Sequence, residues 1–180
     1  MSISQQSSIL AQQTADLLKA KGTKIVFAES CTCGLVAVTL GSIPGISDVL
    51  CGSTVTYRDM SKSGWLGVDP KILADPTITA VSDPVARQMA SGVLKMTPEA
   101  NLAVSVTGHL GPNAPENMDG LAFVGFMRKE QSECDMLVHR IELPEFYPAH
   151  ESNVSLRTLR QEDLLNQILT YLIALLDQST

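Results

Sequence analysis

The sequence of 180 residues contains no run of about 20 apolar residues, which is the length that a membrane-spanning helix needs. Its first eight residues lack a basic segment followed by an apolar core, so we expect no signal peptide and a cytoplasmic location. Basic residues are also few, because 13 Lys and Arg stand against 19 Asp and Glu, for a net charge of −6. This balance argues against nucleic acid as a partner. These features predict a soluble protein that binds neither membranes nor nucleic acid.

Cysteine is scarce as well, at four residues: Cys31, Cys33, Cys51 and Cys134. In a chain of this class such a number predicts reduced thiols rather than a disulfide framework. Cys31 and Cys33 are separated by a single residue, whereas the cysteines of zinc sites usually stand two or more residues apart. The cysteines therefore predict no metal site.

The sequence is otherwise typical of a globular protein, with 44% hydrophobic and 18% charged residues, and its length fits one compact domain over residues 1–180. Hydrophobic periodicity and turn signals predict an alternation of helices and strands, which indicates an α/β fold. We expect a three-layer α/β/α single domain with a mixed sheet and a late antiparallel hairpin. The predicted helices cover 5–21, 32–41, 59–66, 71–74, a segment starting at 82–84, and 155–176, and the predicted strands cover 24–28, 50–58, 101–107, 121–128 and 136–143.

The last predicted helix is apolar over more than one face. That width favours burial against both the sheet and a second copy of the chain, and so predicts a homodimer or a higher homo-oligomer. A thick core within one chain would produce the same pattern.

The stretch from Lys24 to Gly34 changes from apolar to small polar residues just before a predicted helix. Ser30 therefore lies at a strand-to-helix turn, where orphan N–H groups and the helix dipole favour an anion or a developing oxyanion. Two interpretations stay open, because a serine there either caps the helix or acts as a nucleophile.

A serine nucleophile needs a nearby base, and the ends of two other predicted strands offer candidates. Tyr57 and Lys62 follow one strand, and Thr107, Gly108 and His109 follow another. Sites of open α/β sheets lie at the carboxyl ends of the strands, so we expect these groups to converge. His109 and Lys62 are the candidate bases, although Lys62 taken alone is more typical of a solvated helix lysine. The other two histidines, His139 and His150, are interpreted as surface or packing residues.

Six segments, in this order and spacing, resemble the CinA C-terminal domain family: 28–34 (AESCTCG), 43–45 (IPG), 55–62 (VTYRDMSK), 66–68 (LGV), 80–82 (AVS) and 106–112 (VTGHLGP). The resemblance covers about residues 8–128 and, more loosely, the terminal helix. It implies nicotinamide mononucleotide deamidase activity, in which the carboxamide is hydrolysed to nicotinate mononucleotide and ammonia. It also implies that no metal or organic cofactor is required.

The resemblance further implies roles for individual residues. Ser30 would be the nucleophile, with Tyr57 and Lys62 as proton-transfer partners, and the helix N-terminus after Ser30 would supply oxyanion N–H groups. Arg160 is the better match to an arginine that serves an anionic group, and Arg157 is out of register. The implied substrate-binding residues are Cys31, Thr32, Cys33, Gly34, Thr107, Gly108, His109 and Arg160.

The chain departs from the family at three places around this expected site. Cys33-Gly34 stands where two glycines are usual, so we expect a side chain in the turn that approaches the substrate. His109-Leu110 replaces a small apolar pair, and residues 113–119 contain no lysine. The alternative to a deamidase is therefore a catalytically silent or substrate-shifted member that binds a nucleotide or a protein partner.

Overall fold

The structure is a computed structural model, and it describes residues 4–148 and 154–178. His150 lies outside the described residues. The chain forms, in order, α1 (Gln5–Lys21), β1 (Ile25–Glu29), α2 (Leu35–Gly41), the short 3-10 helix η1 (Ile46–Asp48), β2 (Leu50–Val55), α3 (Asp59–Leu66), α4 (Pro70–Ala74), α5 (Asp83–Met96), β3 (Leu102–Gly108), β4 (Leu121–Arg128), β5 (Leu137–Glu142) and α6 (Leu156–Asp177).

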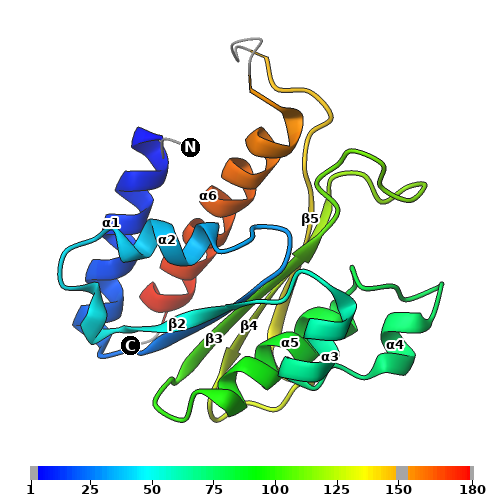
Figure 1. Cartoon of the computed structure of the whole chain (residues 1–180). Coiled ribbons are helices and arrows are strands. Elements are labelled where there is room, and N and C mark those ends of the chain that lie inside the picture. The colour runs from blue at the N-terminus through cyan, green and yellow to red at the C-terminus, as the bar shows by residue number, and fades with distance from the viewer. Residues whose placement is uncertain (1–3, 149–153, 179–180) are drawn as a thin grey trace.

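The five strands form one sheet in the order β2-β1-β3-β4-β5. β1 pairs in parallel with β2 and β3, whereas β4 runs antiparallel to both β3 and β5. Helices cover both faces, with α1, α2 and α6 on one side and α3, α4 and α5 on the other (Figure 1). The predicted α/β fold with a mixed sheet and a late hairpin is confirmed.

Alternation along β1 divides the core between the two faces of the sheet. Ile25 and Phe27 pack with the α1, α2 and α6 side, while Val26 and Ala28 pack with the α5 side. The register places Glu29 beside Val55 of β2 and Val106 of β3. The carboxyl ends of the three parallel strands therefore lie together, and each is followed by one of the segments singled out in the sequence.

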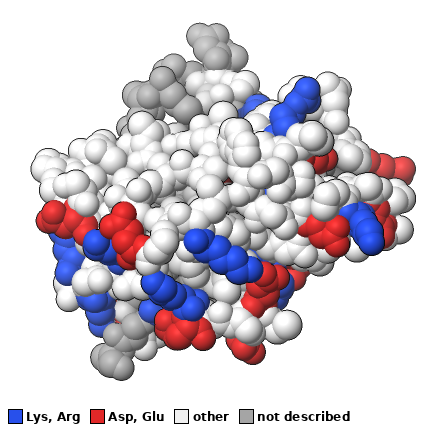
Figure 2. All heavy atoms as spheres, turned by 60° about the horizontal axis from the view of Figure 1, so that its bottom comes forward, with Lys and Arg blue, Asp and Glu red and all other residues white. Residues whose placement is uncertain are grey.

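The apolar residues of α6 are buried within the chain itself. Its leucines pack against the sheet and against α1, in the same cluster as the strand side chains: Leu164, Leu165, Leu169, Leu172 and Leu176. The width of the apolar face is thus accounted for by one chain, and the homo-oligomer stays a prediction without that support. Among the described residues, no helix combines the length and apolar character needed to cross a membrane. Acidic and basic side chains are intermixed on the face shown in Figure 2.

Two element boundaries differ by more than one residue from those expected. The second helix begins at Leu35 rather than near Thr32, because Cys33 and Gly34 have left-handed φ angles of 53° and 91° that a right-handed helix does not contain. β2 ends at Val55 rather than at 58. Tyr57 therefore belongs to the connection to α3 and not to the strand.

Candidate active site

A cavity of about 330 Å³ lies at the carboxyl ends of the parallel strands. This size is at the lower end of the range for small-molecule sites. Its wall is formed by the end of β3, the turns after β1 and β3, and the connection after β2. Two residues of α3, the segment before α5 and one residue of α6 complete it. The lining residues that concern the chemistry are Ser30, Cys31, Tyr57, Asp59, Lys62, Thr107, Gly108, His109, Gly111 and Arg157.

Ser30 follows β1 directly and is held at the edge of the sheet. Its N–H donates to the carbonyl of Val106 in β3 at 3.0 Å, and its own carbonyl accepts from the N–H of Cys33 at 3.1 Å. The residue is 6% exposed. The main chain of Ser30 is thus fixed between the sheet and the turn, while the residue borders the cavity.

Glu29, the last residue of β1, is fully buried and stabilises the turn that follows it. Its carboxylate accepts hydrogen bonds from the hydroxyls of Thr32 (2.8 Å) and Ser53 (3.0 Å) and from the N–H groups of Val36 (3.1 Å) and Ala37 (3.0 Å). The first turn of α2 therefore already holds an anion. The Val36 and Ala37 N–H groups are not free to bind an oxyanion, contrary to the expectation for this helix N-terminus.

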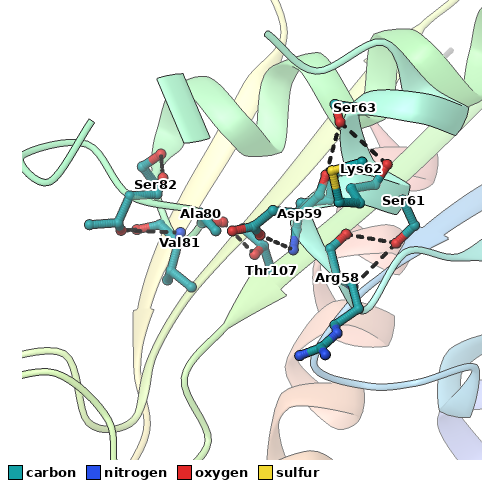
Figure 3. Close-up of polar contacts among 11 residues, drawn as sticks. Arg58, Asp59, Ser61, Lys62, Ser63, Ala80, Val81, Ser82 and Thr107 are labelled. Atoms are coloured by element: carbon teal, nitrogen blue, oxygen red, sulfur yellow. Dashed lines mark hydrogen bonds and ion pairs between the residues drawn. The ribbon is translucent and has the colours of Figure 1, made fainter. Parts of the chain in front are cut away.

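Lys62 lies in the middle of α3 and is 2% exposed, so the interpretation as a solvated helix lysine is wrong. Its ammonium donates to Asp59 Oδ1 at 3.3 Å, one helical turn earlier. Figure 3 shows this ion pair together with the hydrogen bond from Thr107 Oγ1 to the carbonyl of Ala80, and all four residues border the cavity. Within the described ranges no hydrogen bond joins Lys62 to Ser30, and catalytic hydrogen bonds often form only when substrate is bound.

Tyr57 stands at the mouth of the cavity, where it is 53% exposed. Its phenol oxygen accepts a hydrogen bond from Arg157 Nη2 at 3.2 Å. Arg157 comes from the first turn of α6 and also donates to the carbonyls of Gly111 (3.0 Å) and Cys31 (3.5 Å). Arg157 is therefore the arginine that lines the cavity, although the family resemblance placed it out of register.

Arg160, which was expected to bind an anionic group of the substrate, does not line the cavity. Its side chain is fully buried outside the cavity wall, where it forms a bidentate pair with Asp119 (2.8 Å for each bond) and donates to the carbonyl of Pro144 at 2.9 Å. The Arg160 hydrogen bonds hold the pKa of Asp119 below its usual value. Three residues turn a helix by about 300°, which leaves two such positions about 60° apart and sends them to different surroundings.

The carboxyl end of β3 contributes Thr107 and Gly108 to the cavity, and the turn after it contributes His109, so all three predicted residues lie in the wall. A Cβ on Gly108 would lie 2.9 Å from Ala122 Cβ and 3.1 Å from Cys31 Sγ, so no side chain fits there. The main chain of His109 is fixed by hydrogen bonds of 2.8 Å to Leu121 and Gly120. Burial, and then the positive charge of Lys62, lower the pKa of the His109 imidazole, while Asp119 and Asp59 raise it.

The turn after β1 contributes Cys31 to the cavity, but Thr32, Cys33 and Gly34 do not belong to its wall. Thr32 is buried against the carboxylate of Glu29, and Cys33 is exposed to solvent. The expectation that the Cys33 side chain enters the substrate turn is therefore wrong, because its left-handed backbone directs it outward. Burial raises the pKa of the Cys31 thiol to about 12, so this group is a neutral wall residue at pH 7.

The charged groups of the cavity are Lys62, Arg157 and Asp59, with the titratable ring of His109 beside them. Within the described ranges, no three His, Cys, Asp or Glu side chains are grouped so that they could hold a metal ion. The arrangement can accommodate a small anionic ligand and offers a hydroxyl, an amine and a phenol for proton transfer.

Comparison with known proteins agrees with this fold. The chain matches the family described as CinA C-terminal domain over residues 7–146. It is 41% identical over 118 residues to a CinA-like protein of Trichormus variabilis and 39% identical over 119 residues to one of Myxococcus xanthus, and these alignments cover 64% and 65% of this chain. The matched part spans only 28% of the length of either relative.

Solved structures resemble the chain over nearly its whole length. The competence/damage inducible protein CihA of Agrobacterium tumefaciens is 30% identical, with a TM-score of 0.84 and 99% of both chains covered. The competence damage-inducible protein A of Klebsiella pneumoniae is 23% identical, with a TM-score of 0.83 over 97% of this chain and 99% of that one, which supports the fold alone.

Proposed function

The chain belongs to the CinA C-terminal domain family, and from this membership and the chemistry of the cavity we propose that it is an amidohydrolase that converts nicotinamide mononucleotide to nicotinate mononucleotide and ammonia. The observation that carries the proposal is the pairing, on one cavity wall, of a serine at a strand end with a lysine that is 98% shielded from solvent. Lysine is almost never so deeply buried without a partner or a task. Among the described residues its one ion pair is with the partly exposed Asp59, which leaves the rest of the amine group available to Ser30 or the substrate.

In the proposed reaction Ser30 Oγ attacks the carboxamide carbon while its proton passes to the neutral amine form of Lys62. The tetrahedral intermediate collapses when the carbon–nitrogen bond breaks, and the nitrogen leaves as ammonia after it receives the proton from Lys62, with Tyr57 as the relay. A water molecule then attacks the acyl ester and gives one proton to Lys62, which passes that proton to Ser30 Oγ as the ester carbon–oxygen bond breaks. Ser30 and the neutral Lys62 are thereby regenerated, and the acid product leaves as a carboxylate and a proton. Each step needs only these three side chains and water.

The charges around the cavity support an anionic substrate. Arg157 supplies a positive group at the wall, and Lys62 becomes a second one once it has taken the proton of Ser30, against one carboxylate of Asp59. The N–H groups at the start of α2 bind Glu29, so the oxyanion would be stabilised mainly by side-chain donors of the cavity.

Ammonia release from purified protein with nicotinamide mononucleotide tests the proposal. We expect turnover in the wild type and a loss of about a thousandfold or more in Ser30→Ala and in Lys62→Met. Thermal unfolding of each variant serves as the control for folding. The proposal fails if the wild type releases no ammonia, or if Ser30→Ala retains the activity.

A second candidate is hydrolysis of a different amide by the same residues. The observation that favours it is the His109 ring, which the cavity contains where the family usually has a small apolar residue. A panel of pyridine and non-pyridine amides, assayed beside nicotinamide mononucleotide, separates the two candidates by the ratio of kcat/KM values.

A further inference from the structure

The guanidinium of Arg157 joins three chain segments that meet only at the cavity. Nη1 donates to the carbonyl of Gly111 in the turn after β3. Nη2 donates to the carbonyl of Cys31 in the turn after β1 and to the phenol of Tyr57 in the connection after β2. A rigid fork of donors is suited to such a task, because its N–H groups point in fixed directions within one plane.

We propose that Arg157 is a positioning residue that holds Tyr57 and directs its phenolic proton toward the cavity. The proposal rests on the proposed function, since it assigns the arginine a task in the proton relay. It also accounts for the contacts of Arg157, none of which the chemistry of Ser30 and Lys62 explains by itself.

Tyr57 needs a residue that fixes its side chain, because the surrounding fold constrains the ring only weakly. It lies outside β2, and more than half of the residue is exposed. Among the described residues, the group that contacts its phenol oxygen by a hydrogen bond is Arg157. Hydrogen bonds from a charged donor are stronger than neutral ones, so this bond selects one orientation of an otherwise free ring.

The direction of the hydrogen bond determines what the phenol can do. A guanidinium has only donors, so the Tyr57 oxygen must accept and its own O–H cannot point back at Arg157. The phenolic proton therefore stays available to another acceptor, as a relay to the departing nitrogen requires. With a glutamine at 157, whose amide can also accept, this one-way arrangement is lost.

Kinetics of Arg157→Gln and Arg157→Lys provide the first test. We expect kcat to fall about tenfold in both with a smaller change in KM, since one ammonium cannot reproduce the fork. Gln161→Met is the matched control, because Gln161 donates to the same Cys31 carbonyl at 2.9 Å but does not contact Tyr57. Its kcat should stay within about twofold of the wild type.

A double-mutant cycle separates positioning of Tyr57 from a general structural role. In a Tyr57→Phe background, Arg157→Gln should reduce kcat by less than about twofold, because the group through which it acts is already gone. Independent effects that simply multiply would overturn the proposal. So would a loss confined to KM and to phosphate-bearing substrates, measured against nicotinamide riboside, because Arg157 would then bind the phosphate.

A spectroscopic test does not depend on any activity. The sequence contains three tyrosines, so protein labelled with 3-fluorotyrosine should give three fluorine NMR signals, of which the Tyr57 signal is assigned by its absence in Tyr57→Phe. Arg157→Gln should move this signal toward that of free tyrosine, and Gln161→Met should not. An unchanged Tyr57 signal overturns the proposal, whereas a changed signal without ammonia release from the wild type means that only the proposed function fails.

Discussion

The turns after β1 and β3 border the same cavity, but they are held by different means. The buried carboxylate of Glu29 holds the first turn by accepting four hydrogen bonds. Three of the donors lie three, seven and eight residues further along the chain, and the fourth is Ser53 in the neighbouring strand β2. The second turn is held from outside by α6, whose arginines reach Gly111 and Asp119 across 46 and 41 residues of chain. The nucleophile turn thus has a buried support of its own in addition to the bonds that Arg157 and Gln161 of α6 donate to the Cys31 carbonyl, whereas the side-chain support of the opposite wall comes from α6.

The largest expected effect comes from removing the internal support. Glu29→Leu leaves four buried or partly buried donors without their acceptor, and we expect the free energy of unfolding to fall by roughly 4 kcal/mol. Glu29→Gln keeps the shape and one acceptor oxygen and should cost about half as much. Urea denaturation of the variants measures both values.

Ser53→Ala is the control for this comparison, since it removes one of the four donors and leaves the carboxylate in place. We expect a loss of about 1 kcal/mol. If Glu29→Leu unfolds at the same urea concentration as the wild type, the turn after β1 does not depend on its carboxylate, and the contrast between the two turns is wrong.

Removing the external support should cost less. Arg160→Met keeps the buried volume but loses the bidentate pair with Asp119 and the bond to Pro144, and we expect a loss of about 2 kcal/mol, discounted because the Asp119 side chain is 47% exposed. Gln167→Met offers a control on the same helix, since that residue bonds only Asp163 among the described side chains.

The same pair predicts a pH dependence of stability. Because Arg160 lowers the pKa of Asp119, the folded state binds its proton less readily than the unfolded state does. The contribution is therefore complete well above pH 3.8 and disappears as the pH falls through the lowered value. Unfolding free energies of the wild type and Asp119→Asn, measured between pH 2 and 7, should converge at the acid end, and parallel curves would contradict the assignment.

The difference between local and long-range support also explains which features could be predicted from the sequence. The bounds of α1, α3 and β4 were predicted to the residue, and β1 and β3 end one residue beyond their predicted ends, because local periodicity and turn residues determine them. β2 ends three residues before its predicted end. Glu29 was overlooked, although a carboxylate inside an apolar strand, followed by Ser-x-Thr and a helix, was a usable signal.

The choice between Arg157 and Arg160 could not be made from sequence. Both lie in the first turns of α6, and their surroundings depend on how that helix docks on α1 and α2 and beside the turns after β1 and β3, which no local pattern encodes. The same limit applies to Thr32 and Cys33, since only the left-handed turn decides which side chains face the cavity.

The smallest expected effect concerns His109, on the externally held turn. Because burial and the charge of Lys62 lower its pKa, the ring is neutral at pH 7 and gains its proton only below its ordinary value of 6.5. The imidazolium would add a positive charge to the cavity, so an anionic ligand should bind about threefold more tightly as the pH falls from 7 to 5. Calorimetric titration of Ser30→Ala with nicotinamide mononucleotide measures this without turnover.

The ligand phosphate also titrates in this range, with a second pKa of about 6, and protonation there weakens binding to a basic cavity. His109→Ile and His109→Gln are each combined with Ser30→Ala, and the titration of the phosphate affects their affinities and that of Ser30→Ala equally. The ratio of the affinity of each double variant to that of Ser30→Ala therefore reports the titration of His109 alone. We expect the ratio to change with pH in the same way for both replacements, since they differ in shape and polarity but neither titrates. A ratio that is constant from pH 5 to 8 would show that the ring does not bind the substrate, and the turn after β3 would then contribute shape to the cavity without charge.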